Sequence, residues 1–509
     1  MNRHLLLFIL IFPLFSCLSC SDDDKKEDIL NISTTQLNFK ARGGIQTFDI
    51  KTNGQWTIIP EEVDSGIKIS PLTGTGDATI TVEVAENEKE IELLTSFKVK
   101  MASKWETISI KREAYSFPTE GNFYPLVTIN TEGGKPIDSK DYYVNATITV
   151  EQRNEKGVVT SKLLDAAKTE IKGRGNSTWT MMPKKPYRLK LDKSAVMLDM
   201  PKNKHWVLLA NYSDKTLMRN ELAFEVSRRM GFVYTPRMKY VDVVLNGDSI
   251  GNYLLGEHIR IGDDRVNIPE LGTLDTDISG GYLLEVDERK GEPEWFETSG
   301  AKMIFCINTP ENIPANQKEY ISSCVQKVED ILYAKDGVNP VAELPKYLDL
   351  TSFVDYYLLN ELSKNVDGNL RLSTFVYKNR GDAKIYFGPV WDYDIAFGNV
   401  NYDNCQATAG WHARNADWYQ KFFKYPEFDK MVKDRWIKLR QGNLSDLNSF
   451  IDNLAEKMLI SQRRNFLRWP ILNEAVWPNP VVTGSYKGEV NYLKSWLKDR
   501  LAWMDQQLR

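Results

Sequence analysis

Two aspartates follow an apolar run in the second half of the chain, where residues 384–398 read KIYFGPVWDYDIAFG. The run 385–391 predicts a short buried strand that ends at Asp392 and Asp394. Because alternate residues of an extended strand point to the same face, both carboxylates are expected to project together. Two such carboxylates are costly at the end of a core strand unless a cation or hydrogen-bond donors compensate them. The pair indicates either a solvated turn or a divalent-metal site, whose hard oxygen ligands would suit Mg²⁺ and substrate phosphates.

The composition limits the chemistry that this site could support. At 509 residues the chain is longer than a usual single domain, so at least two domains are expected. The formal net charge of −4 disfavours a nucleic-acid binder, which usually carries a basic excess. Beyond the first few residues the histidines are His205, His258 and His412, which leaves little material for a zinc site or a Ser-His-Asp triad.

Residues 1–20 have the pattern of a secretory signal peptide. Arg3 precedes the apolar run 5–15, which is too short to span a membrane. Small residues before a cysteine and the acidic run 21–24 resemble a bacterial lipoprotein signal, with Cys20 as the lipidated residue and Cys17 as the alternative. Acyl chains on that cysteine would anchor the protein stably, whereas a plain secreted protein is the other interpretation. The acidic run also resembles the surface-export signal of Bacteroidetes lipoproteins, which implies an envelope protein exposed at the outer membrane.

An acidic tether, residues 21–29, precedes a segment with the texture of an all-β domain. Short stretches that alternate apolar and polar residues, separated by glycine-rich turns, predict a β-sandwich; they are 37–39, 47–50, 80–84 and 107–110. The segments GGIQT, TNGQW and SPLTGTG resemble the BACON module of Bacteroidetes surface proteins. That resemblance implies an immunoglobulin-like sandwich over residues 30–113, which serves as a spacer or contacts glycans.

After a linker, residues 114–123, a second domain is expected over residues 124–509. A strand leads into the turn Gly173-Arg174-Gly175, whose backbone N–H groups could face an anion. In the strand that follows, Arg188 and Lys190 share the polar face. A lysine on this face could reach phosphate oxygens, although an exposed amphipathic strand would show the same pattern.

The remaining pattern alternates helices and strands and predicts an α+β fold. The expected helices are 211–230, 313–335 and 341–363, with further helices after residue 417. The expected strands are 238–245, 253–259, 280–288 and 372–377. Glu257 and Glu285 stand within two of these strands, and Asp367 stands in a loop just before the last one.

The order of these parts is that of a protein kinase: glycine turn, cationic strand, helix, hairpin, helical stretch, aspartate loop, and strand ending in aspartate. The motifs RGNSTW, KPYRLK, LLAN, MRNELA and GPVWDYDIAFG resemble those of the spore-coat protein H (CotH) kinase-like family, and the resemblance covers residues 124–509. It implies an atypical kinase fold, similar to the secretory-pathway kinases. It also implies transfer of the γ-phosphoryl group of ATP, with Mg²⁺ or Mn²⁺, to protein serines.

The resemblance also assigns acidic roles by position. Asp367 matches the loop aspartate that orients or deprotonates the acceptor hydroxyl, and Asp392 matches the aspartate that holds the metal, with Asp394 assisting. Protein kinases place an asparagine metal ligand five residues after the loop aspartate. This chain has Leu372 there, and Asn369 or Ser373 could substitute.

The phosphate-binding role has several candidates. Lys190 matches it by position, and Lys185 and Arg174 compete with Lys190. Glu257 and Glu285 are candidates for an ion pair with the cation or for a second metal.

These observations support an active, surface-anchored kinase whose substrate is an envelope or extracellular protein. The alternative is a catalytically silent kinase-like lipoprotein acting in adhesion, scaffolding or glycan contact. A glycoside hydrolase that uses Asp392 and Asp394 as its acid and base is the third hypothesis, and the kinase-like order of parts disfavours it.

Overall fold

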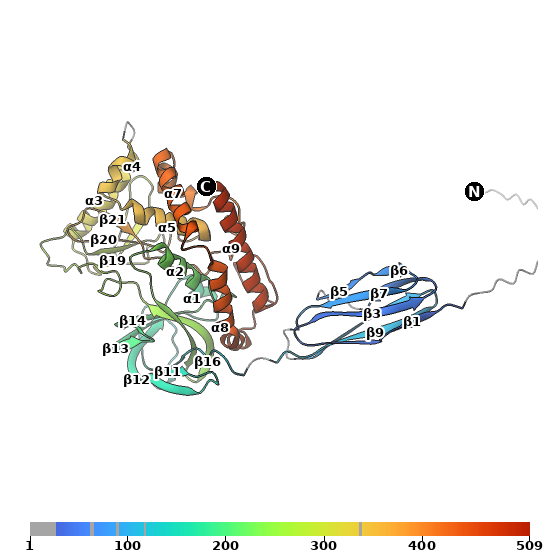
Figure 1. The fold of residues 1–509 in the computed structure, drawn as a ribbon. Helices are drawn as coiled ribbons and strands as arrows, with labels where there is room; N and C mark the ends of the chain where they lie inside the picture. Colours follow the sequence, from blue (N-terminus) through green and yellow to red (C-terminus); the bar gives the residue numbers. More distant parts are fainter. Residues whose placement is uncertain (1–26, 62–65, 88–90, 117–118, 335–337) are drawn as a thin grey trace, which may run out of the picture. The chain divides into compact units, whose positions relative to one another are not determined.

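The computed structural model describes residues 27–61, 66–87, 91–116, 119–334 and 338–509 (Figure 1). Cys17 and Cys20 lie outside these residues. The chain divides into two compact units, residues 1–117 and 118–509, and each contains its own hydrophobic core. Helices and strands are both abundant, which confirms the α+β class. Among the described residues, every helix is too short or too polar to cross a membrane.

The first unit consists of two sheets that enclose one core. Their strand orders are β1-β3-β7-β5 and β2-β9-β8-β4-β6. The strands are β1 (Leu30–Ile32), β2 (Gln36–Phe39), β3 (Gly44–Thr52), β4 (Gln55–Pro60), β5 (Ile67–Ser70), β6 (Thr73–Thr75), β7 (Ala78–Val84), β8 (Leu93–Met101) and β9 (Lys104–Arg112). The four alternating stretches of the sequence lie in β2, β3, β7 and β9, and their alternate side chains, such as Phe48 and Ile80, fill the core.

The second unit begins with a closed barrel of strand order β10-β11-β12-β13-β14-β16-β15. The strands are β10 (Leu126–Thr131), β11 (Val144–Arg153), β12 (Val159–Gly173), β13 (Tyr187–Met197), β14 (Met200–Leu209), β15 (Met238–Leu245) and β16 (Asp248–Glu257). The parallel pairing of β10 with β15 closes the barrel, and the other neighbours are antiparallel. Ile148, Leu189 and Leu255 belong to its core, whereas Leu254 on the other face of β16 belongs to the larger core of this unit.

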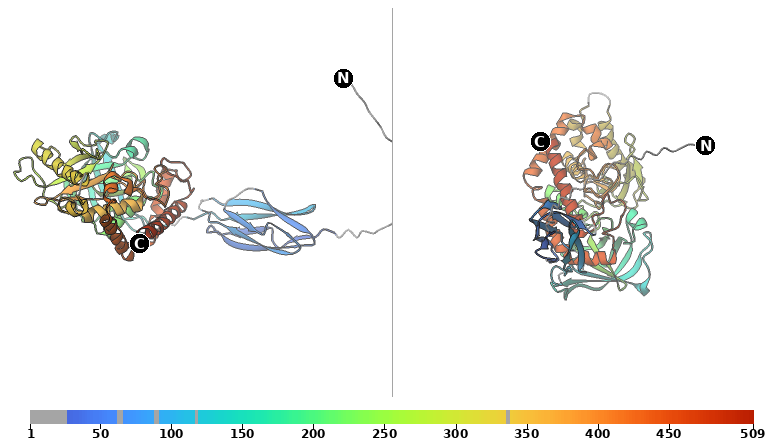
Figure 2. Two further views of the ribbon diagram at one scale, coloured as in Figure 1. Left: turned by 90° about the horizontal axis from the view of Figure 1, so that it is seen from above. Right: turned by 90° about the vertical axis from the view of Figure 1, so that its right-hand side faces the viewer.

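A second sheet of order β18-β19-β17-β20-β21 and most of the helices complete this unit (Figures 1 and 2). The strands are β17 (Tyr282–Val286), β18 (Trp295–Glu297), β19 (Ile304–Thr309), β20 (Thr374–Lys378) and β21 (Ile385–Phe387). The helices are α1 (Ser177–Met181), α2 (Arg219–Met230), α3 (Ala315–Leu332), α4 (Pro340–Glu343), α5 (Leu350–Ser363), α6 (Asp417–Phe422), α7 (Pro426–Gln441), α8 (Leu447–Arg468) and α9 (Tyr486–Leu508). Short 3₁₀ turns are η1 (Glu132–Gly134), η2 (Leu344–Lys346) and η3 (Ala413–Asn415). One core joins the sheet to α2, α3, α5, α7, α8 and α9.

Two helices differ from the expectation: one begins later in the chain, and the other is interrupted. The helix expected from residue 211 begins at Arg219, because the Asp214 carboxylate accepts hydrogen bonds from the backbone N–H groups of Thr216 (3.0 Å) and Arg219 (2.7 Å). Such side-chain bonds compete with helical ones and make residues 211–218 a loop. The helix expected over 341–363 is interrupted by η2, which contains a proline in its first turn.

The strand expected over residues 385–391 ends at Phe387. Gly388 adopts a φ of 114°, and Pro389 has no N–H group to donate to a neighbouring strand. Asp392 and Asp394 therefore lie in a loop, and the prediction that they project from the end of a strand is wrong.

A fully buried ion pair holds the end of α5 to α9. The Arg500 guanidinium contacts the Glu361 carboxylate at 2.6 Å, and neither side chain is exposed to solvent. Arg500 also donates to the backbone oxygens of Glu361 (2.7 Å), Thr408 (2.8 Å) and Gly410 (2.8 Å). The other donors to the Glu361 carboxylate are the backbone N–H groups of His412 and Arg414. The pair thus ties two helices to the segment 408–414.

We predict that Arg500→Met lowers the free energy of unfolding by about 3–5 kcal/mol, because it leaves Glu361 buried without its cation. Urea unfolding followed by tryptophan fluorescence measures the change. Arg509→Met is the matched control: its ion pair with Asp505 (3.3 Å) is 61% exposed on the arginine side, so a change below about 1 kcal/mol is expected. Equal effects of the two substitutions would contradict the prediction.

Candidate active site

Two strained loops carry the three aspartates singled out in the sequence. Asp367 lies in the loop between α5 and β20, and Asp392 and Asp394 lie in the loop after β21. Residues other than glycine that adopt a positive φ recur in both loops; they are Lys364, Leu370, Ser373, Asp392 and Phe397. Such conformations are unfavourable, and they persist only where surrounding contacts enforce them, often at functional sites.

Buried amides hold the two loops together. Asn365 donates to the backbone oxygen of Asp392 (3.1 Å), and the Asn365 side-chain oxygen accepts a bond from the Asp367 N–H (3.3 Å). The Tyr393 hydroxyl donates to Asn360 (3.0 Å) on α5, and its backbone N–H donates to Asn220 (2.8 Å) on α2. The aspartates are therefore positioned by groups from α2, α5 and both loops.

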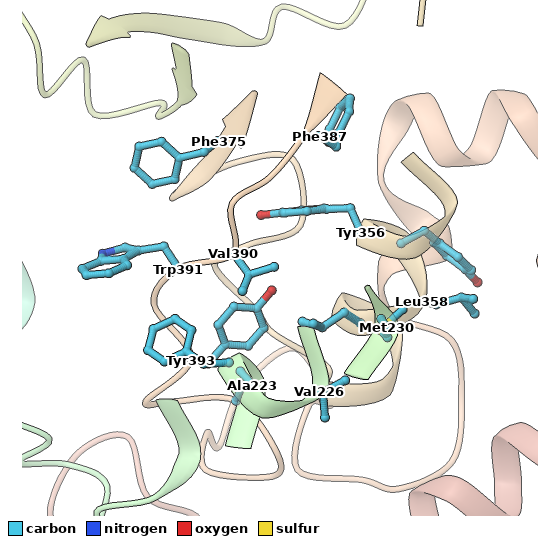
Figure 3. Packing of buried hydrophobic residues seen from close by; sticks show 14 of the residues in the cluster. Ala223, Val226, Met230, Tyr356, Leu358, Phe375, Phe387, Val390, Trp391 and Tyr393 are labelled. Carbon is cyan, nitrogen blue, oxygen red and sulfur yellow. The ribbon is translucent and has the colours of Figure 1, made fainter. Parts of the chain in front are cut away.

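Aromatic packing also holds the loop that contains Asp392 and Asp394. Trp391 and Tyr393 are buried next to side chains of α2 and of the sheet, including Ala223 and Phe375 (Figure 3). The rings of Trp391 and Phe224 lie 6.0 Å apart. Alternating burial in this loop leaves Asp392 and Asp394 half-buried between these anchors.

The three carboxylates repel one another. Burial, then the charge of Asp392, raises the pKa of Asp367 to about 6. Burial also raises the pKa of Asp394 well above its ordinary value, with the charges of Asp392, Asp214 and Asp367 adding to the effect. Ser373 donates a long hydrogen bond to the Asp392 carboxylate (3.4 Å). The structure therefore brings these three aspartates together in one acidic region.

Arg174 and Glu285 adjoin this acidic region. The Gly173-Arg174-Gly175 turn is tight, since a Cβ atom on Gly173 would lie 2.4 Å from the Trp179 ring. The Arg174 guanidinium lies over the Trp391 ring, 5.4 Å from its centroid. Burial lowers the pKa of Arg174, while the charges of Asp392, Glu285 and Asp394 act in the opposite direction. Burial and the charge of Asp287 raise the pKa of Glu285 to about 8.

Arg188 is the cation to which the sequence analysis gave no role. It pairs with Lys172 across β12 and β13, on the polar face of the barrel. Its charge opposes the rise in the pKa of Glu292, which burial causes, and adds to the burial that lowers the pKa of His258. The Nε atom of Arg188 is buried, and none of the described residues accepts its hydrogen bond. The alternation of strand residues puts Arg188 on the same face as Lys190 and two residues nearer to the glycine turn.

Three of the predicted site residues lie elsewhere. Lys190 forms an exposed ion pair with Glu170 (3.3 Å), and Lys185 lies over the Trp179 ring at 5.6 Å. Glu257 is fully buried and ion-paired with Arg237 at 2.6 Å. Of the candidates near position 372, Ser373 contacts Asp392, while Asn369 donates to the His412 backbone oxygen (3.4 Å).

The donor set fits a hard divalent cation that also binds a phosphate ligand. Among the described residues, no three His, Cys, Asp or Glu side chains form a ready metal cluster. Mg²⁺ needs no such cluster, because it usually uses one or two carboxylates together with waters and substrate phosphates. Asp392 and Asp394 are the residues that would hold it, since their mutual repulsion is what a cation would relieve.

We predict that Asp367→Asn makes the protein more stable than the parent at about pH 7.5, and that this difference shrinks toward about pH 4. The folded-state pKa of about 6 exceeds the ordinary 3.8, so the parent loses stability as the pH rises between these values, and the amide does not. Thermal unfolding at both pH values, without divalent cations, measures the difference. Asp165→Asn is the control because its side chain is 67% exposed. A difference that does not depend on pH would contradict the prediction.

Comparison with known proteins gives one short sequence match and several weak structural ones. A xyloglucan-specific endo-β-1,4-glucanase from Bacteroides ovatus is 30% identical over 115 residues, and the match covers 22% of each protein. The chain thus spans about a fifth of the length of that relative. A Bacteroides ovatus GH5 xyloglucanase structure is 14% identical and matches 42% of this chain and 36% of its own, with a TM-score of 0.17. An NMR structure of a Bacteroides thetaiotaomicron protein is 16% identical and matches 19% of this chain and 98% of its own, with a TM-score of 0.14. These scores are too low to compare the folds.

The family comparison covers much more of the molecule. Residues 171–504 match the family described as CotH kinase protein. The matched region begins in β12, next to the glycine turn, and ends within α9. It includes Arg174, Asp367, Asp392 and Asp394, and it confirms the resemblance inferred from the motifs. The chain therefore belongs to the CotH kinase protein family.

Proposed function

We propose that the protein is an atypical kinase that transfers the γ-phosphoryl group of ATP to serine hydroxyls of envelope or extracellular proteins. The observation that carries this proposal is the gathering of Asp367, Asp392 and Asp394 beside Arg174, within a CotH-family domain. The proposal includes an atypical protein-kinase fold, with the barrel as the part that covers the nucleotide.

This arrangement suits phosphoryl transfer, which depends mainly on positioning and on neutralising charge. Asp392 and Asp394 would hold Mg²⁺ or Mn²⁺, and the bound metal would neutralise charge on the phosphate oxygens. We assign Arg174 of the glycine turn, on which Asp392 and Asp394 act, and Arg188 of β13 to the phosphates in place of Lys190. The half-buried surroundings strengthen each of these interactions relative to water.

The Asp367 carboxylate is suited to accept the proton of the serine hydroxyl. The serine oxygen bonds to the γ-phosphorus, the bond from that phosphorus to the bridging oxygen of ADP breaks, and the serine proton passes to the Asp367 carboxylate. The products are ADP and a phosphoserine. A pKa of about 6 leaves the carboxylate ionised near neutral pH yet basic enough to accept a proton.

The cellular setting is part of the proposal. A lipid on Cys20 would anchor the protein at the outer membrane, with the chain exposed at the surface of a Bacteroidetes bacterium. The first unit, a two-sheet sandwich, would be a BACON-like, immunoglobulin-like module between the anchor and the kinase unit. The lipoprotein signal pattern and the short match to a Bacteroides ovatus protein support this setting.

We predict that ATP with excess Mg²⁺ or Mn²⁺ raises the unfolding temperature and that Asp392→Asn abolishes the rise. A ligand that binds only the folded state stabilises by about 2.7 kcal/mol at a hundred times its Kd. Differential scanning fluorimetry with ATP alone, metal alone and both together measures the effect. Asp248→Asn, on the exposed ion pair of Asp248 with Arg468, is the control and should keep the full rise. Without a rise for any nucleotide, the silent scaffold alternative would replace the kinase proposal.

We predict that Asp367→Asn keeps the nucleotide-dependent rise in unfolding temperature but reduces phosphoryl transfer at least about 100-fold, the usual contribution of a positioned proton acceptor. Incorporation of labelled phosphate into protein, measured beside the thermal shift, separates the two functions. A variant that loses nucleotide binding would show that Asp367 belongs to the nucleotide site instead.

A further inference from the structure

Two further cations, Arg289 and Arg371, lie close enough to Asp367 for their charges to act on it. The charges of Arg289 and Arg371 lower the pKa of Asp367, against the larger effect of burial. Arg371 lies four residues after Asp367 in the same loop, and Arg289 follows β17. Arg174, by contrast, is influenced by Asp392, Glu285 and Asp394. The site therefore has arginines of two kinds. Arg174 interacts with Asp392 and Asp394, and Arg289 and Arg371 interact with Asp367.

Both arginines are accessible and only loosely held. The Arg371 side chain is 47% exposed and lies 3.2 Å from Glu288, whose side chain is 52% exposed. Arg289 is 36% exposed, and its contact with Asp287 is 3.5 Å long. The Arg371–Glu288 pair is exposed on both sides and contributes little free energy, so an incoming carboxylate can replace Glu288 at small cost.

An aromatic surface adjoins the same aspartate. The rings of Tyr402 and Trp477 are stacked, with centroids 6.1 Å apart and planes inclined by 11°. Trp477 is 47% exposed, although it is large and apolar. Tyr402 is close enough to Asp367 for that charge to raise its pKa, after the effect of burial. It packs on Val366 and Val400 of the two aspartate loops. A rigid apolar surface beside an accessible cation pair is typical of a recognition site.

We propose that Arg371, Arg289, Tyr402 and Trp477 form the acceptor site and select a peptide whose serine is flanked by acidic residues. This inference rests on the proposed kinase function. The arginines would bind carboxylates next to the serine, and the aromatic pair would cover the peptide chain on which these residues stand. A neutral glycan acceptor would use the aromatic pair but leave two arginines without a role, so the charges favour the acidic peptide.

The test is direct binding, which does not depend on turnover. Three fluorescein-labelled peptides share one sequence and place glutamate, glutamine or lysine on both sides of a central serine. Fluorescence anisotropy with the purified protein, ADP and Mg²⁺ measures their affinities. We expect the glutamate peptide to bind at least about tenfold more tightly than the glutamine peptide, the usual size of one charge-assisted contact.

Substitutions then connect this preference to the arginines. Arg371→Gln should remove most of the tenfold difference, Arg371→Lys should restore part of it, and Arg371→Glu should shift the preference to the lysine peptide. In transfer assays Arg371→Gln should raise KM for the glutamate peptide more than it changes kcat. Arg468→Gln is the matched control, because Arg468 is 42% exposed and forms one ion pair (2.9 Å) away from the aspartate loops.

The outcomes separate this inference from the kinase proposal. If ATP and metal stabilise the protein but the three peptides bind equally, or if a neutral oligosaccharide displaces the glutamate peptide, the acidic-peptide inference is wrong and the kinase proposal stands. Binding of the glutamate peptide that Arg371→Gln does not weaken also overturns the inference. If neither nucleotide nor peptide binds, both proposals fail.

Discussion

The buried contact between Arg500 and Glu361 determines the geometry of the candidate site. Glu361 lies near the end of α5, and its carboxylate and backbone oxygen accept hydrogen bonds from Arg500, which also donates to Thr408 and Gly410 of the segment 408–414. Because this contact fixes the end of α5, it also fixes the point at which the segment from Lys364 to Asp367 leaves the helix. Lys364 adopts a left-handed conformation and donates to the Ala409 backbone oxygen (2.7 Å), which continues the same constraint. A charge pair that offers no net stability over an apolar pair can still fix one conformation in this way.

The site itself is the opposite case, because three carboxylates of like charge lie close together there. The charge of Asp392 adds to the effect of burial in raising the pKa of Asp367 and of Asp394, and the Asn365 amide bonds to the Asp392 backbone oxygen. A protein selected only for stability would replace at least one of these carboxylates by an amide. Carboxylates held close together are what a metal bound to a phosphate ligand would use, and the contacts of α2 and α5 hold them in that arrangement.

The cations divide between two sources. Arg174 and Arg188 come from the barrel, where closure of β10 on β15 fixes the strands and the glycine turn. Arg289 and Arg371 come from the sheet side and from the aspartate loop. Because of this division, we assign the barrel arginines to the phosphates and the other two arginines to the acceptor peptide, around the same carboxylates. Lys190 lies two residues further along β13 and pairs with Glu170 on the neighbouring strand, where both side chains are exposed.

The sequence alone determined the residue types, the order of the motifs, the α+β class and the position of strands such as β7 and β15, because these depend on local alternation. It also placed Asp392 next to an apolar run, and the family match agrees with the motif order. Only the tertiary structure decided which cation faces the aspartates, where the strand before Asp392 ends, and that Glu257 pairs with Arg237. Tyr402, Trp477 and Arg371 carry no recognisable motif, and the stacking of Tyr402 on Trp477 joins two segments that are far apart in the chain. Periodicity is a short-range signal, whereas these contacts join residues far apart in the chain and depend on packing that the pattern does not encode.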